Sequence, residues 1–65
     1  MDLTYQERYT LCKMLRRYIK NSTYEPFMKE GFYRVVDDFE RFGRPGDMKE
    51  FKLLKDLVDE ALGFL

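Results

Sequence analysis

Residues 28–42, which read MKEGFYRVVDDFERF, decide the fold of this chain. Apolar side chains recur in this stretch at steps of four, three, four and three residues, with one more beside them: Met28, Phe32, Val35, Val36, Phe39 and Phe42. This spacing places them along one side of an α-helix. The opposite side is charged and carries Glu30, Arg34, Asp37 and Arg41. An apolar stripe of this size needs cover, which the flanking segments must supply.

The segment before this stretch predicts a helix over residues 4–20. Thr4 and Glu7 form the S/T-x-x-E pattern of a capping box, which marks a helix start. At about 100° per residue, one face of this helix collects the apolar side chains. These are Leu11, Cys12, Leu15, Tyr18 and Ile19.

The second helix is predicted over residues 26–42. Pro26 suits a first helical turn, and Gly43 suits a left-handed terminator. Gly31 lies in the interior, where glycine costs about 1 kcal/mol relative to alanine. We interpret Gly31 as a point of close approach of a neighbouring helix, with a functional backbone contact as the alternative.

The third helix is predicted over residues 47–63, because Asp47 and Glu50 repeat the cap-and-glutamate pattern. Its apolar side chains span roughly 180°, wider than the ~100° stripe that a surface helix needs. They are Phe51, Leu53, Leu54, Leu57, Val58, Ala61, Leu62, Phe64 and Leu65. With short connections between helices, the sequence predicts an all-α fold, a small antiparallel three-helix bundle that forms one domain over residues 1–65.

Composition sets the class of protein. Cys12 is the only cysteine among 65 residues, which excludes an intramolecular disulfide and fits a reducing compartment. No stretch has the pattern of a signal peptide or the length of a membrane span. We therefore expect a cytoplasmic protein that does not enter the membrane.

Catalytic and metal-binding chemistry find few candidate residues. The chain has no histidine, Ser22 lies in a turn, and Cys12 falls on an apolar helix face. The acidic residues fall mainly on polar faces and do not fit a calcium loop or a di-metal bundle. They are Asp37, Asp38, Glu40, Asp56, Asp59 and Glu60. We expect no enzyme activity, no catalytic residue, no cofactor and no metal.

The wide apolar arc of the third helix favours protein binding. We expect Leu53, Phe64 and Leu65 to stay outside the core and to contact a partner, which is another protein or a second copy in a homodimer. Tyr9 and Tyr33 lie on charged sides of their helices, as interface tyrosines do. The sequence thus favours a small interaction module that acts as a regulator, inhibitor or adaptor. Compact chains of this kind include proteins encoded by phages and plasmids.

A basic face on the first helix supports the alternative, a nucleic-acid-binding regulator. The face carries Lys13, Arg16, Arg17 and Lys20. These cations could bind phosphates, with Tyr9 stacking on a base. The whole chain, however, has zero net charge and a pI of about 6.2, unlike most nucleic-acid-binding domains. A solvated face, or one paired within the chain, is the simpler interpretation.

Overall fold

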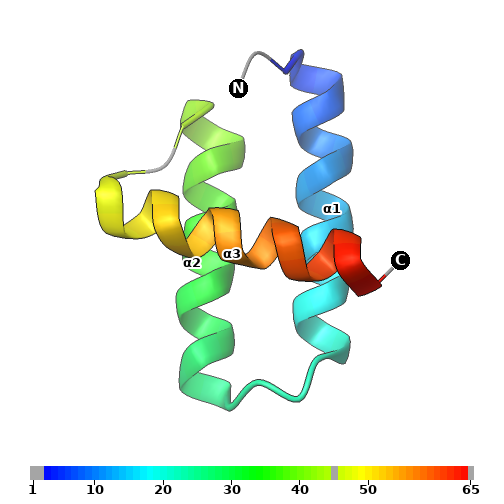
Figure 1. Ribbon diagram of the computed structural model, residues 1–65. Helices are drawn as coiled ribbons and strands as arrows, with labels where there is room; N and C mark the ends of the chain where they lie inside the picture. The colour runs from blue at the N-terminus through cyan, green and yellow to red at the C-terminus, as the bar shows by residue number, and fades with distance from the viewer. Residues whose placement is uncertain (1–2, 45, 65) are drawn as a thin grey trace.

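Three α-helices make up the computed structural model, which describes residues 3–44 and 46–64 (Figure 1). They are α1 (Tyr5–Asn21), α2 (Pro26–Phe42) and α3 (Met48–Phe64). No strand occurs in the described part of the chain. The prediction of a small all-α three-helix bundle is confirmed, and the helix ends lie within one residue of the predicted ranges.

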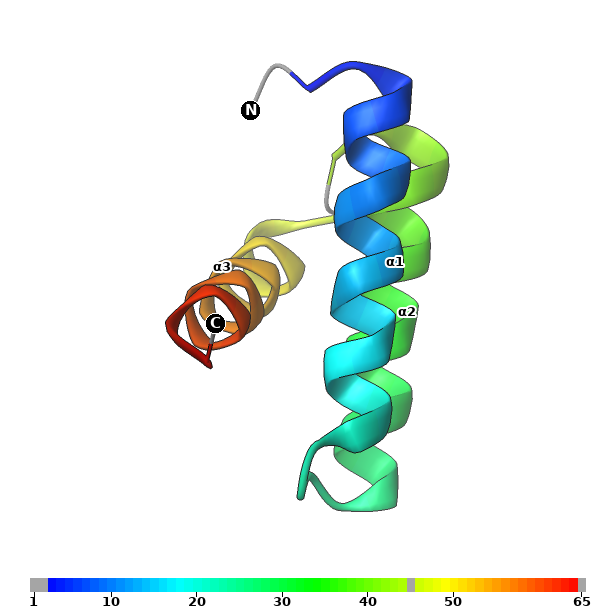
Figure 2. The ribbon, with the colours of Figure 1, turned by 90° about the vertical axis from the view of Figure 1, so that its right-hand side faces the viewer.

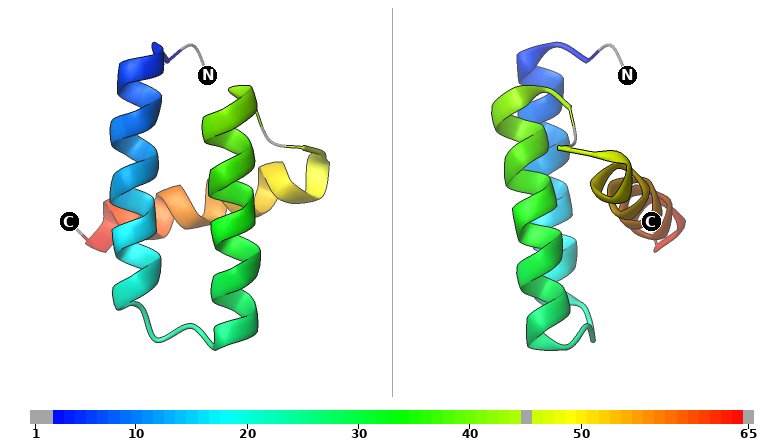
Figure 3. Two further views of the ribbon diagram at one scale, coloured as in Figure 1. Left: turned by 180° about the vertical axis from the view of Figure 1, so that it is seen from behind. Right: turned by 90° about the vertical axis from the view of Figure 1, so that its left-hand side faces the viewer.

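The helices form a pair and a crosspiece. α1 and α2 run antiparallel, side by side, and α3 lies across one face of this pair (Figures 1 and 2). Viewed from behind, α3 crosses both helices between the α1–α2 loop and the open end of the pair (Figure 3). The antiparallel relation therefore describes α1 and α2, whereas α3 runs transversely to both.

Local hydrogen bonds define where the helices start. The Thr4 hydroxyl accepts from the Glu7 backbone N–H (3.1 Å), and the Glu7 carboxylate accepts from the Thr4 N–H (2.9 Å). This capping box confirms the predicted start of α1, and its hydrogen bonds lower the pKa of Glu7. Asp47 caps α3 by accepting from the Glu50 N–H (2.8 Å), while the Glu50 carboxylate accepts from the Gly46 N–H (2.7 Å).

The two glycines of interest in and after α2 have different roles. Gly43 has a φ of +76° and ends α2 in the left-handed conformation, as predicted. The interpretation of Gly31 is wrong, because a Cβ built there would meet no atom within 4 Å. Gly31 faces open space rather than a neighbouring helix.

Among the described residues, the core receives three side chains from each helix. Its buried members are Cys12, Leu15, Ile19, Val35, Val36, Phe39, Leu54, Leu57 and Ala61. The predicted stripe of α2 is covered only in its middle, since Met28 is 39% exposed and Phe42 is 63% exposed. α3 crosses the pair rather than running along it, so it cannot cover both ends of that stripe.

Candidate protein-binding surfaces

One flank of α3 exposes large apolar side chains. The buried stripe of this helix consists of Leu54, Leu57 and Ala61. Beside it lie Met48, Phe51, Val58 and Leu62, which we call the open flank. At 3.6 residues per turn they share an arc of roughly 80°. Met48 is 81%, Phe51 50% and Leu62 56% exposed, and Val58 is half-buried against the core.

Hydrogen bonds at the opposite flank show which way the open flank faces. The Glu60 carboxylate accepts from the hydroxyls of Tyr18 (3.5 Å) and Tyr24. Partial burial and this carboxylate raise the pKa of Tyr18. Because Tyr24 belongs to the α1–α2 loop, the Glu60 flank faces that loop. The open flank therefore faces the other end of the pair, where Phe42 is also exposed.

The predicted contact residues of α3 lie elsewhere on the helix. Leu53 is half-buried and packs against the core, so it offers less surface than the sequence suggests. The side chain of Phe64 and the whole of Leu65 lie outside the described residues. The signal for the open flank was present in the sequence, because Phe51, Val58 and Leu62 belong to the wide apolar arc. The width of that arc did not reveal which of its two flanks α1 and α2 cover.

The two tyrosines on charged helix faces differ in exposure. Tyr9 on α1 is 45% exposed. Tyr33 on α2 is half-buried and packs partly against the core. Tyr9 thus remains available to a partner to a greater extent than Tyr33.

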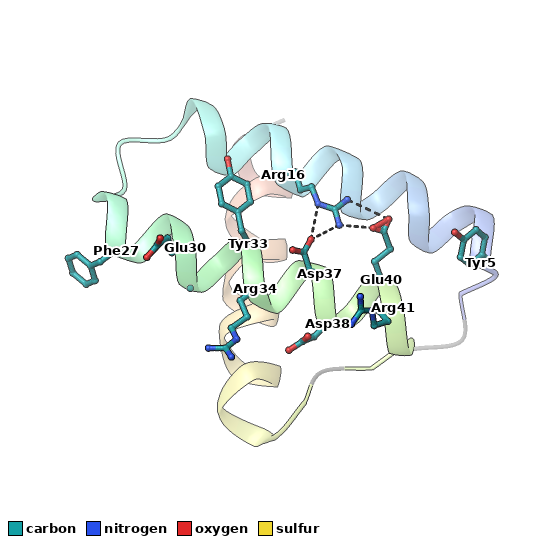
Figure 4. Close-up of a pocket in the computed structure, with 11 residues that line it drawn as sticks. Tyr5, Arg16, Phe27, Glu30, Tyr33, Arg34, Asp37, Asp38, Glu40 and Arg41 are labelled. Carbon is teal, nitrogen blue, oxygen red and sulfur yellow. Dashed lines mark hydrogen bonds and ion pairs between the residues drawn. The ribbon is translucent and has the colours of Figure 1, made fainter.

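Arg16 of the basic face is paired within the chain. Its guanidinium lies between two carboxylates of α2, with Nη2 2.7 Å from Asp37 Oδ1 and 2.6 Å from Glu40 Oε2 (Figure 4). Hydrogen bonding to Glu40 and Asp37 raises the pKa of Arg16. The pairing removes one of the four cations that the nucleic-acid alternative requires, and it agrees with a face paired within the chain.

The other three cations of that face have no such partner. Lys13, Arg17 and Lys20 are exposed and make no side-chain hydrogen bond or ion pair within the described ranges. They line a hollow together with Thr10, Met14, Arg16 and Tyr33. We call Lys13, Arg17 and Lys20 the outer basic cluster.

The Cys12 thiol and the Ser22 hydroxyl both form hydrogen bonds to backbone carbonyl groups. The Cys12 thiol is fully buried and donates to the Val36 carbonyl oxygen (3.8 Å), and burial raises its pKa to about 11. The Ser22 hydroxyl donates to the Ile19 carbonyl (2.6 Å) at the end of α1. Among the described residues, no group of three His, Cys, Asp or Glu side chains could hold a metal ion.

Comparison with known proteins identifies no relative. No protein-family model, no curated protein and no solved structure matches this chain. Within residues 3–44 and 46–64, no helix has both the length and the apolar character needed to cross a membrane.

Proposed function

We propose that this protein is a non-enzymatic interaction module of the cytoplasm. It acts as a regulator or adaptor of another protein and docks on that protein through the open flank of α3. The observation that carries the proposal is the exposure of Met48, Phe51 and Leu62 beside a buried stripe on the same helix. Isolated exposed apolar side chains are common, but an ordered row of them on one helix face is typical of an interaction site.

The spacing of the open flank suits a helix-in-groove contact. Its members and Lys55 follow one another at steps of three, four, three and four residues. This is the pattern by which an amphipathic helix lays one face into an apolar groove. The central position, Lys55, is exposed and can extend its charged end to the rim of such a groove.

Two other classes have weaker support. An enzyme would need a reactive group, whereas the chain has no histidine and its only thiol is buried. A nucleic-acid-binding regulator would use the basic face of α1, where Arg16 is neutralised by Asp37 and Glu40.

The test compares two sets of substitutions at apolar positions that are each at least half exposed. The double variant Phe51→Ser/Leu62→Ser removes the open flank, and Phe27→Ser changes a 68% exposed phenylalanine at the start of α2. Each protein is used to capture partners from nuclease-treated lysate, and its mass in solution is measured by light scattering. We expect a partner, or a dimer mass, that wild type and Phe27→Ser retain and the double variant loses.

The proposal fails if the double variant keeps the same partners and the same mass as wild type. It also fails if Phe27→Ser loses them equally, because the effect would then belong to any exposed apolar side chain. Circular dichroism of each variant establishes that the helices remain folded.

A further inference from the structure

The outer side of α1 carries three cations, Lys13, Arg17 and Lys20, that form no ion pair among the described residues. From Arg8 to Tyr24 the chain has five basic residues and no acidic residue. Arg8 donates from Nε to the Glu40 carbonyl oxygen (3.2 Å), and Arg16 pairs with Asp37 and Glu40. Both of these cations therefore serve the contact between α1 and α2, and the outer basic cluster does not.

The outer basic cluster is compact. At 3.6 residues per turn its three side chains share an arc of roughly 60°, and they span about 10 Å along the helix axis. Like charges this close repel one another and disfavour the free protein slightly. A ligand that brings negative charge relieves this repulsion.

We infer that the outer basic cluster is a docking surface for an acidic segment of a protein partner. Carboxylates at helical or extended spacing can pair with Lys13 and Lys20, and Arg17 can hold one carboxylate with two hydrogen bonds. Met14 and Tyr33, which line the same hollow, add apolar contact area. Among the residues of this hollow, Arg17, Met14 and Tyr33 are of types that are enriched at protein interfaces.

The charges around the cluster favour a protein segment over a nucleic acid. Asp37, whose side chain is 64% exposed, forms an ion pair with Arg16, and Arg16 lines the hollow. A nucleic-acid strand carries a phosphate at every nucleotide, so its negative charge would extend beyond the cluster and would be repelled by the Asp37 carboxylate. An acidic protein segment is finite and can match three cations.

This surface is separate from the open flank. The residues that line the hollow belong to α1 and α2, whereas the open flank belongs to α3, which lies across one face of that pair (Figure 2). The inference therefore does not depend on the proposed docking through α3, and each can fail alone.

The experiment measures binding of a fluorescent peptide of alternating glutamate and alanine by anisotropy. The test variant is Lys13→Ala/Arg17→Ala/Lys20→Ala. The matched control neutralises three exposed lysines of α3, at positions 49, 52 and 55, and so has the same net charge. We expect the test variant to bind about tenfold more weakly than wild type, the effect of losing three exposed ion pairs. The control should bind within about twofold of wild type.

A charge-reversal variant guards against a trivial loss of binding. Lys13→Glu/Arg17→Glu/Lys20→Glu should bind a peptide of alternating lysine and alanine, which wild type should not bind. Equal weakening in the test variant and its control, or no binding of the acidic peptide to wild type, would overturn the inference. Tighter binding of an oligothymidylate of equal charge, lost in the same test variant, would overturn it in favour of a nucleic acid.

Discussion

The contact between α1 and α2 and the contact of α3 with that pair bury similar apolar side chains. They differ in the polar groups that flank the apolar packing. Between α1 and α2, apolar packing is flanked by Arg16 and Arg8, which bind the side chains and backbone of α2. α3 packs through an apolar stripe, and its Glu60 carboxylate accepts hydrogen bonds from Tyr18 of α1 and from Tyr24 of the α1–α2 loop.

This difference shows how the two contacts are specified. Charged hydrogen bonds are directional, so they define the alignment of α1 with α2. Apolar burial is not directional and allows α3 to cross the pair with one flank uncovered. The same lack of cover leaves a surface for a partner.

The largest expected effect is a difference in stability between a substitution in the buried stripe of α3 and a substitution in its open flank. Leu57 is fully buried, so Leu57→Ala should lower the free energy of unfolding by about 2–5 kcal/mol, through lost burial and a cavity. Leu62 is 56% exposed, so Leu62→Ala should cost less than about 1 kcal/mol. Urea denaturation of both variants measures the difference. Equal losses would mean that the open flank is part of the core.

The second prediction uses pH to probe the contact between α1 and α2. Burial raises the pKa of Cys12 from 9.0 to about 11, so the folded state keeps the thiol protonated while the unfolded state ionises. The stabilisation is complete well below pH 9 and is lost as the pH rises through 11, by about 3 kcal/mol in total. Cys12→Ala should lack this part of the decline. Parallel stability curves for the two proteins would contradict the assignment.

A third, smaller effect concerns a position that belongs to neither contact. Gly31→Ala should raise the free energy of unfolding by about 1 kcal/mol, because alanine favours the helix and its Cβ meets open space. Thermal unfolding provides the measurement. Gly43→Ala is the control and should destabilise the protein, because Gly43 has a φ of +76°. A destabilised Gly31→Ala variant would show that another surface lies against this residue.

The smallest effect tests the charged cross-link. Arg16→Gln should lower the free energy of unfolding by roughly 0.2–1 kcal/mol, because the pairs with Asp37 and Glu40 are partly exposed. The loss should shrink at high salt. Arg17→Gln removes a neighbouring cation that has no ion pair in the described chain and should change stability little. If the two variants lose the same amount, the cross-link contributes no stability.

The sequence alone predicted the helices and most of their ends. The Thr4–Glu7 box, the Asp47 cap and the Gly43 terminator depend on groups within about four residues of one another, so their patterns are visible locally. The repeated spacing of apolar residues likewise placed the buried residues on apolar helix faces, although it placed the exposed Met28 and Phe42 there too.

Only the tertiary structure decided which surfaces remain open. The exposure of Phe51 and Leu62, the half-burial of Leu53 and the pairing of Arg16 depend on how α3 crosses the pair and how α1 aligns with α2. These contacts join residues more than 20 positions apart in the chain, as with Arg16 and Asp37. Periodicity gives the width of an apolar arc, but the way in which neighbouring helices cross determines which part of that arc is buried from solvent.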